Sequence, residues 1–492
     1  MSTVTTVKLS RRLAPGWVRV QICWIVPVVA TWLVVSWQAA RPQPWRDEIA
    51  SWSAATRTVP EIFALGKNID GVLVPYYLFL HYWIAWRGDS VAAMRSPSLL
   101  AMTATAAAVA LLARRFWGNK AGMLGGLLFA MMPIVSRYGQ EIRGYAFASL
   151  FATLATLALA SALEKSAWWR WVLYGLCVAL MGLSHLLSVL ILAGHLVMVI
   201  VLGWWFGRWR ILWWALAAAA GLGAVLPLTQ RGLGQQSEQL SWLDPAGPQA
   251  LADIAGAIFQ APVVGGIVIG LALATLWRDR ASASVLLWVT VLLPVGLLYA
   301  YDQLVSPIFL GRYLLFCVPL LCALAGAGLS LLRLPLALVA VLAIGAIGLP
   351  TQFSYRRDHS SFDYQAAARI VLTNERAGDG IVYEPRDGWQ SVDLGLGYYL
   401  RDRAPRDLLL KSNEVQNASL WATECDDQTK CIGDTKRIWV VAADNLDPAY
   451  RATPTNQLPY EAKAVLNRYY VPLVTWRVGG LTVALFVRPP AV

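Results

Sequence analysis

Apolar segments separated by short polar connections dominate the first 350 residues of the chain. About eleven of these segments are long enough to cross a bilayer as helices, some of them only when tilted. They are residues 20–40, 92–113, 121–136, 145–163, 168–184, 187–206, 211–228, 262–277, 281–300, 314–332 and 334–350. No signal-peptide cleavage site precedes the first segment, so we expect it to remain as a span. The pattern predicts an α-helical polytopic membrane domain over residues 1–350.

Residues 41–91 do not follow this pattern. Asp47 and Glu48 open an amphipathic stretch that ends near Gly66, and an apolar run follows at 71–86. A membrane crossing at 71–86 would invert the sidedness of every later basic loop. We therefore expect helices that lie in the membrane interface, a depth that tyrosine and tryptophan side chains favour.

The tail, residues 351–492, has the pattern of a folded polar domain. Helices are predicted at 363–376 and 458–470, and short buried strands at 381–383, 437–443 and 481–487. A segment of about 140 residues is an ordinary size for one compact domain. We therefore predict a single α/β domain over residues 351–492.

The composition agrees with a membrane protein, because 57% of the residues are hydrophobic, 14% are charged and the mean hydropathy is +0.52. With the N-terminus placed inside, the predicted cytoplasmic segments hold two acidic residues, Glu164 and Asp279, and fourteen basic ones. The basic residues are Lys8, Arg11, Arg12, Arg19, Arg114, Arg115, Lys120, Lys165, Arg170, Arg208, Arg210, Arg278, Arg280 and Arg333. Basic and acidic residues balance elsewhere, so this excess equals the whole net charge of +12. The positive charge therefore indicates topology rather than nucleic-acid binding, and it places the tail outside the cytoplasm.

Six cysteines divide between the apolar spans and the tail. Those in the spans, expected to be inert core residues, are Cys23, Cys177, Cys317 and Cys322. Cys425 and Cys431 lie in the polar tail. In an oxidising compartment their spacing suggests a disulfide that closes a short loop, and the alternative is two free thiols.

Polar and charged residues at the predicted outer ends of the spans are the candidates for chemistry, because charges at membrane depth are costly. They gather in five places, which are Asp47 with Glu48, Asp70, Glu141 with Arg143 and Tyr145, His185, and Asp302 with Arg312 and Tyr313. A carboxylate can accept a proton from a hydroxyl group, and an arginine can hold a phosphate through its planar fork. Tyrosine and histidine can add hydrogen bonds. These are the parts that glycosyl transfer needs.

Each candidate also has a purely structural interpretation. Asp47 and Glu48 could belong to a solvated extended loop, in which neighbouring side chains point to opposite sides. Asp70 could cap a helix, Glu141 could pair with Arg143, Arg312 and Tyr313 could anchor a span at the interface, and His185 could be a turn residue. His195 lies inside a span with no evident partner, so it is assigned to the core.

Asp47-Glu48 and three later stretches resemble the GT-C superfamily of integral membrane glycosyltransferases, in particular bacterial members of the protein O-mannosyltransferase and aminoarabinose-transferase type. The stretches run from Asp89 to Gly118, from Tyr138 to Tyr145 and from Ser306 to Tyr313. The resemblance covers about residues 20–335 and, more loosely, the α/β tail, and it rests on the order and spacing of the motifs. Many relatives carry a His-Pro-Pro-Leu-Tyr-like segment where this chain has Asp70 through Tyr77, a variant similar to actinobacterial mannosyltransferase-like members.

The resemblance implies an inverting displacement on the extracytoplasmic face of a bacterial plasma membrane, with Asp47 as general base. Glu48 is the second catalytic candidate, and the sequence alone leaves open which of the two carboxylates is the base. The donor would be a polyprenyl-phosphate-linked sugar, most simply mannose or a pentose such as arabinose, and the acceptor a glycan, glycolipid or protein. No cofactor or metal is implied as required, although a divalent cation would be compatible with the acids. Substrate binding would fall to Asp70, Tyr76, Tyr77, Glu141, Arg143, Tyr145, His185, Arg312 and Tyr313.

A polyprenyl-linked lipid or sugar transporter is the main alternative. Against it, the sequence shows no internal repeat and no pair of broken helices near the bilayer midplane. A membrane acyl transferase would need a nucleophile or a His–Asp dyad on one face, which the pattern does not offer. A receptor with the tail as its binding module would not explain the charges at the membrane boundary.

Overall fold

The computed structural model describes residues 17–278, 283–357, 360–386, 388–444 and 458–490. The chain divides into two compact units. The membrane unit comprises Met1–Ala39, Gly71–Tyr76 and Ala92–Tyr355, and the loop–tail unit comprises Ala40–Asp70, Tyr77–Val91 and Arg356–Val492. Most of residues 41–91 therefore group with the tail, whereas the sequence-based division joins them to the membrane domain. The charged residues Lys8, Arg11, Arg12, Asp279 and Arg280 lie outside the described residues.

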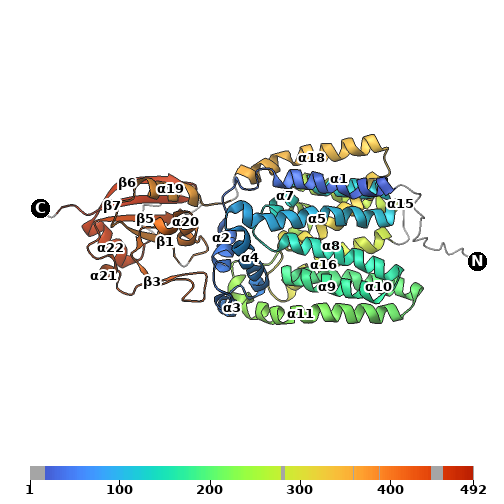
Figure 1. The fold of residues 1–492 in the computed structure, drawn as a ribbon, viewed down its shortest axis with the longest axis horizontal. Coiled ribbons are helices and arrows are strands. Elements are labelled where there is room, and N and C mark those ends of the chain that lie inside the picture. The colour runs from blue at the N-terminus through green and yellow to red at the C-terminus, as the bar shows by residue number, and fades with distance from the viewer. Residues whose placement is uncertain (1–16, 279–282, 358–359, 387, 445–457, 491–492) are drawn as a thin grey trace, which may run out of the picture. The chain divides into compact units, whose positions relative to one another are not determined.

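The membrane unit is a bundle of long helices (Figure 1). Its elements are α1 (Trp17–Ser36), η1 (Gly71–Leu73), α5 (Val91–Trp117), α6 (Asn119–Met131), α7 (Pro133–Gly139), α8 (Tyr145–Glu164), α9 (Trp168–Ser184), η2 (Leu186–Leu190), α10 (Ile191–Phe206), α11 (Trp209–Gln239), α12 (Gln249–Ala252), α13 (Ile254–Phe259), α14 (Pro262–Leu273), α15 (Thr275–Arg278), α16 (Ala283–Leu304), η3 (Gly311–Cys317), α17 (Val318–Leu329) and α18 (Leu334–Arg357).

Seven helices among the described residues are long and apolar enough to cross a membrane. The pair α6 and α7, bent by 65°, would make an eighth span, and shorter apolar helices lie at Val20–Ser36 and Pro262–Trp277. Within the described residues, most of the predicted apolar segments coincide with one helix, whereas 121–136, 187–206, 262–277 and 314–332 are each divided between two consecutive helices. The number of long spans is smaller than eleven because several of these helices are short. The chain is a multi-pass helical membrane protein with a small C-terminal sheet domain, as the sequence predicts.

Helix α17 forms the core of the membrane unit, since all of its residues are buried. A Cβ atom at Gly326 of α17 would lie 2.4 Å from the Cα of Gly125 in α6. Close approach through small residues is typical of membrane helices, and here only glycine permits it.

His195 has polar partners inside this bundle. Its Nε2 lies 3.0 Å from the Thr156 hydroxyl, and its Nδ1 lies 3.1 Å from the hydroxyl of Tyr174. The Tyr174 hydroxyl also accepts the indole N–H of Trp214 at 2.8 Å. The network provides hydrogen-bond partners for the buried imidazole and links α8, α9, α10 and α11. His195 is therefore a core residue, as expected, but it has polar partners that the sequence did not reveal.

The loop–tail unit combines three helices of the 40–91 segment with an α/β fold. The former are α2 (Arg46–Ala55), α3 (Val59–Asn68) and most of α4 (Val74–Arg87). The latter comprises α19 (Tyr364–Asn374), β1 (Gly380–Glu384), α20 (Val392–Leu400), η4 (Arg401–Arg403), β2 (Arg406–Asp407), β3 (Leu410–Ser412), β4 (Thr423–Glu424), α21 (Gln428–Ile432), β5 (Arg437–Ala443), α22 (Tyr460–Tyr469), β6 (Val471–Val478) and β7 (Leu481–Val487).

Five strands form one sheet in the order β2-β1-β5-β7-β6. The pairs β1–β2 and β1–β5 are parallel, and β5–β7 and β6–β7 are antiparallel. The central strands β1, β5 and β7 are buried along almost their whole length. Cys425 and Cys431 form a disulfide beside this core. The predicted strands are β1, β5 and β7, and the two predicted helices are α19 and α22.

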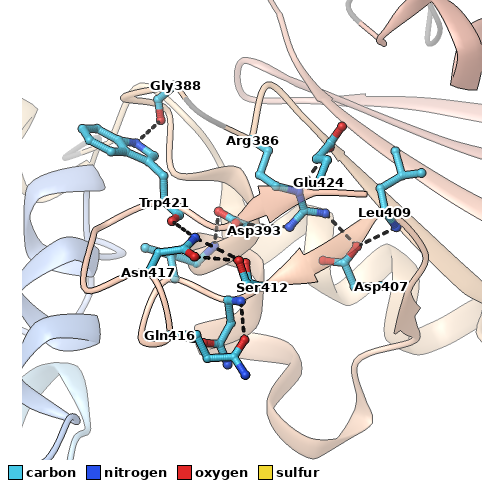
Figure 2. A network of polar contacts seen from close by, with 12 residues as sticks. Arg386, Gly388, Asp393, Asp407, Leu409, Ser412, Gln416, Asn417, Trp421 and Glu424 are labelled. Carbon is cyan, nitrogen blue, oxygen red and sulfur yellow. Dashed lines mark hydrogen bonds and ion pairs between the residues drawn. The ribbon is translucent and has the colours of Figure 1, made fainter. Parts of the chain in front are cut away.

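A buried ion cluster joins α20, β2 and β4 of this domain (Figure 2). The Arg386 guanidinium is 2.7 Å from Asp407, 3.2 Å from Glu424 and 3.5 Å from Asp393. Its side chain is only 3% exposed, and one positive charge faces three carboxylates. Burial raises the pKa of Asp393 to about 6, although the charge of Arg386 acts in the opposite direction. Asp393 is therefore the member of the cluster expected to take up a proton in mild acid.

Replacing Asp393 by Asn should change how stability depends on pH. An unfolded aspartate has a pKa of about 3.9, so between about pH 4 and pH 6 the folded protein keeps a proton that the unfolded chain has lost. This contribution stabilises the fold at low pH and is lost as the pH rises through about 6. The Tm of Asp393→Asn relative to the wild type should therefore increase from about pH 5 to about pH 8.

Thermal unfolding of the full chain, followed by tryptophan fluorescence, measures this difference. Asp426→Asn is the matched control, because Asp426 is an exposed carboxylate of the same domain that pairs with Lys411 at the surface. A Tm difference for Asp393→Asn that stays constant or shrinks with rising pH would contradict the assignment.

Candidate functional site

The acidic pair Asp47-Glu48 lies in the first turn of helix α2, not in an extended loop. This corrects the expectation that the two side chains point to opposite sides of a strand-like segment. Glu48 is fully buried, and its carboxylate accepts the backbone N–H of Trp45 at 3.2 Å. It thus closes the N-terminal end of the helix, where a negative charge is also favourable. Glu48 has a structural task that Asp47 does not share.

Asp47 is the more accessible member of the pair, with 27% of its side chain exposed. Its Oδ1 lies 3.7 Å from the Nε of Arg46. Burial raises the pKa of Tyr364, at the start of α19, well above its ordinary value. The same hydroxyl interacts electrostatically with Arg46, Asp393 and Asp47. Asp47 therefore lies at a polar surface formed by α2 and the tail, within one compact unit.

Asp70 and Tyr77 are brought together in the same unit. Asp70 has a left-handed backbone, with φ of 56°, and its carboxylate accepts the hydroxyl of Tyr77 at 2.6 Å. Tyr76 points elsewhere, because it belongs to the membrane unit and its ring lies 6.5 Å from that of Phe147. Both tyrosines are almost completely buried.

Glu141 lies in the membrane unit between α7 and α8 and is almost fully buried. Its Oε2 is 3.6 Å from the Nη1 of Arg137, four residues earlier in the chain, and the two side chains form a largely buried ion pair. The hydroxyl of Ser98 holds the same segment by donating to the carbonyl of Glu141 at 2.6 Å and to that of Arg143 at 3.4 Å. These contacts fix the backbone from which Arg143 projects.

Four rings from distant parts of the sequence form a continuous aromatic cluster, defined here as Tyr138, Tyr145, His185 and Tyr313. Successive ring centroids are 5.0, 5.0 and 5.2 Å apart in that order. The guanidinium of Arg312 lies 5.7 Å from the Tyr313 ring. Four predicted site residues from α8, the α9–η2 junction and η3 are thus neighbours, namely Tyr145, His185, Arg312 and Tyr313. The arrangement offers a cation and several hydrogen-bonding groups on one aromatic wall.

Sequence reasoning missed three residues beside this cluster. Gln260 donates to the hydroxyl of Tyr138 at 3.2 Å and accepts the hydroxyl of Tyr355 at 2.8 Å. The guanidinium of Arg137 lies 5.9 Å from both tyrosine rings. Arg137 stands next to a recognised motif and could have been found, whereas Gln260 follows an apolar helix and has no sequence signal.

Asp302 holds the segment that leads to Arg312. Its Oδ1 accepts the backbone N–H groups of Ile308 and Phe309 at 2.6 and 2.7 Å, and its Oδ2 accepts that of Ala246 at 2.8 Å. Gly311 lies in close contact with Ala257, because a Cβ atom at Gly311 would be 2.0 Å from the carbonyl oxygen of Ala257. Asp302 thus acts on the site through the backbone, by fixing the entry to η3.

The predicted site residues divide between the two units. Asp47, Glu48, Asp70 and Tyr77 belong to the loop–tail unit. Tyr76, Glu141, Arg143, Tyr145, His185, Arg312 and Tyr313 belong to the membrane unit. The carboxylate suited to proton transfer and the arginines suited to phosphate binding are therefore presented by different units.

Comparison with known proteins adds an independent finding. Residues 70–229 match the family model described as dolichyl-phosphate-mannose-protein mannosyltransferase. Comparison with curated proteins gives no match. The crystal structure of ArnT from Cupriavidus metallidurans in the apo state is 14% identical with a TM-score of 0.63, covering 94% of this chain and 97% of that one. The same protein bound to undecaprenyl phosphate is 13% identical with a TM-score of 0.64, covering 96% and 98%.

At this level of identity, the structural matches show a shared fold over almost the entire length of both chains. The family model agrees with them and lies across α4 to α11, where several of the predicted motifs stand. Both findings confirm the resemblance that the motifs suggested. The chain thus has the fold of ArnT and, over residues 70–229, matches the mannosyltransferase family model, which supports the resemblance to the GT-C superfamily of integral membrane glycosyltransferases.

Proposed function

We propose that the protein transfers a sugar from a polyprenyl-phosphate donor to a cell-envelope acceptor on the extracytoplasmic side of a bacterial plasma membrane. The observation that supports this most is the placement of Arg312 beside Tyr145, His185 and Tyr313. A similar fold has been solved with undecaprenyl phosphate bound. Mannose, or a pentose such as arabinose, is the proposed sugar, and the acceptor is a glycan, a glycolipid or a protein.

Arg312 and Arg143 would hold the donor phosphate. A guanidinium binds two phosphate oxygens at once through its planar fork, and the hydroxyl groups of Tyr145 and Tyr313 can add hydrogen bonds. As the sugar departs, negative charge grows on the phosphate oxygen that bore it. Fixed cations beside that oxygen stabilise the transition state more than the ground state.

Asp47 would act as general base. Its carboxylate takes the proton of the acceptor hydroxyl while the hydroxyl oxygen attacks the anomeric carbon of the sugar. The bond from that carbon to the phosphate oxygen breaks, and its electron pair stays with the polyprenyl phosphate. Attack opposite the leaving group inverts the anomeric configuration. Glu48 is less suited to this role because it is buried and closes the end of α2.

A turnover assay in liposomes tests the function. Purified protein is supplied with undecaprenyl phosphate bearing radiolabelled mannose or arabinose, together with a cell-envelope extract as acceptor. We expect label to move into the acceptor as free undecaprenyl phosphate appears. Label that crosses the bilayer still attached to its lipid would instead identify a transporter.

The proposed orientation predicts that a cysteine on the tail is accessible in intact cells. Arg369→Cys lies on the exposed side of α19, and Lys165→Cys lies in a connection predicted to be cytoplasmic. An impermeant maleimide should label Arg369→Cys directly and label Lys165→Cys only after the membrane is opened. The reverse pattern would overturn the topology.

A further inference from the structure

Helix α2 is too short to be stable alone, since ten-residue helices in water are marginal without tertiary contacts. Its position is therefore set by whatever packs against it. Within the loop–tail unit, α2 packs against α20 of the C-terminal domain. The position of Asp47 thus depends on residues more than three hundred positions away in the sequence.

Four side chains make this contact specific, and they are called the clamp here: Trp52 of α2, Asp89 after α4, Tyr398 of α20 and Arg401 of η4. One carboxylate oxygen of Asp89 accepts both the indole N–H of Trp52 at 3.0 Å and a guanidinium N–H of Arg401 at 2.7 Å. The backbone carbonyl of Asp89 accepts the hydroxyl of Tyr398 at 3.0 Å. All three donors converge on a single residue of the loop.

The two rings of the clamp lie next to the same cation. Trp52 and Tyr398 meet edge to face at 5.1 Å between centroids. The guanidinium of Arg401 lies 5.1 Å from the Trp52 ring and 4.5 Å from the Tyr398 ring. Such cation–π contacts add to the ion pair, and the planar guanidinium, unlike a compact ammonium, can lie against aromatic faces while it binds the carboxylate.

The backbone of Arg401 is held in an uncommon conformation at this point. Its φ is 51°, in the left-handed region that residues other than glycine seldom adopt. Residues keep such a conformation only where their surroundings determine it, commonly at functional sites. Burial alone would raise the pKa of Asp89, but hydrogen bonds from Trp52 and Arg401 hold that pKa below its ordinary value.

Other contacts hold the loop to the tail independently of the clamp. Arg57 donates to the carbonyl of Ser419 at 2.7 Å, and Asn68 donates to the carbonyl of Ala418 at 3.0 Å. Gln43 donates to Asp363 at 3.2 Å at the opposite end of the segment. Removing one clamp residue should therefore let α2 shift without detaching the loop.

We propose that Arg401 is a positioning residue for the reaction, which through the clamp fixes α2 and so aims Asp47 at the acceptor hydroxyl. This inference rests on the proposed function. A general base must lie within about 2.6–3.2 Å of the group that it deprotonates. A displacement of about 1 Å can cost about 100-fold in rate, so a loosened clamp lowers turnover even when the fold survives.

Arg401→Ala and Arg403→Ala form a matched pair. Both arginines lie in η4 and are exposed, but Arg403 pairs with Glu375 inside the domain and does not belong to the clamp. We expect Arg401→Ala to lower kcat by about 10- to 100-fold while the Kd for undecaprenyl phosphate stays within about twofold of the wild type. Arg403→Ala should change neither value.

Two milder variants separate positioning from folding. Arg401→Lys keeps the ion pair with Asp89 but loses the planar contact with both rings, so its kcat should lie between those of the wild type and Arg401→Ala. Tyr398→Phe removes one hydrogen bond and keeps the ring, and it should lower kcat by about two- to tenfold with an unchanged Tm.

Wild-type kcat in both Arg401→Ala and Tyr398→Phe would overturn the inference, as would a loss of lipid affinity equal to the loss of kcat. Asp47→Asn, assayed alongside, distinguishes this failure from that of the proposed function. If Asp47→Asn is inactive and the clamp variants are normal, the base stands and the clamp does not. If Asp47→Asn turns over normally, the assignment of the base fails, and the inference built on it fails too.

Discussion

Replacing Asp47 by Asn is expected to lower kcat by about 100-fold or more while the protein still folds, inserts and binds the donor. Asparagine is nearly isosteric with aspartate but cannot take the proton of the attacking hydroxyl. The partial exposure of Asp47 makes a surface contact with an acceptor feasible. Turnover of labelled donor by the purified variant, normalised to the amount of folded protein, measures the loss.

Glu48→Gln is the matched control for this prediction. The variant keeps a side-chain oxygen that can accept the N–H of Trp45, so α2 should keep its capped end. Its kcat should fall by no more than about tenfold, since no proton transfer is removed. Near-normal turnover in Asp47→Asn, combined with an inactive Glu48→Gln or Asp70→Asn, would move the base to the other carboxylate.

Arg312→Ala should weaken binding of the donor by about 10- to 100-fold, the range for losing one or two charge-assisted hydrogen bonds to a phosphate. Arg312→Lys keeps the charge and loses the fork, so its affinity should fall less but still measurably. Arg143→Ala should act in the same direction. Isothermal titration of undecaprenyl phosphate into the detergent-solubilised protein gives the affinities.

Arg231→Ala serves as the control, because it removes a positive charge from the same predicted side but from α11, outside the sequence motifs that carry Arg143 and Arg312. Its affinity for undecaprenyl phosphate should equal that of the wild type. Unchanged affinity in both Arg143→Ala and Arg312→Ala would show that the phosphate is bound elsewhere.

The sequence was most informative where one physical property decides the structure. Long apolar runs have few alternatives to membrane helices, so the predicted spans lie on one helix or on two consecutive helices of the described residues. Continuous apolar runs likewise revealed β5 and β7 with their observed bounds. Strands β5 and β7 are buried along almost their whole length, and burial is what such apolar runs record.

Elements at the edge of the tail were missed for a related reason. Strand β6 contains Pro472 and is mostly exposed, so it has no long buried apolar run, although apolar and polar residues alternate from Val474 to Val478. Proline is tolerated there because β6 is an edge strand, and the register shifts beside it. Helix α20 begins after Ser391, a residue type that often caps helices, but here its backbone is left-handed and its side chain makes no capping hydrogen bond.

The site was predicted as separate places rather than as an arrangement. Tyr145, His185 and Tyr313 drew attention as polar residues near span ends, but nothing local shows that their rings touch. The start of α2 was missed because Trp45, at the N-cap, is not one of the residues that normally cap a helix. The attachment of α2 to the tail depends on long-range contacts that one sequence does not reveal.

The central claim is that the protein breaks the bond between a polyprenyl phosphate and its sugar. Native mass spectrometry of the purified protein loaded with undecaprenyl-phosphate-linked sugar tests it in one step. When the acceptor extract is added, the bound lipid should lose the mass of one sugar and become undecaprenyl phosphate, and the Asp47→Asn complex should keep its full mass. If the wild-type protein releases or keeps the donor uncleaved, and neither bound nor free undecaprenyl phosphate is formed, the account is contradicted.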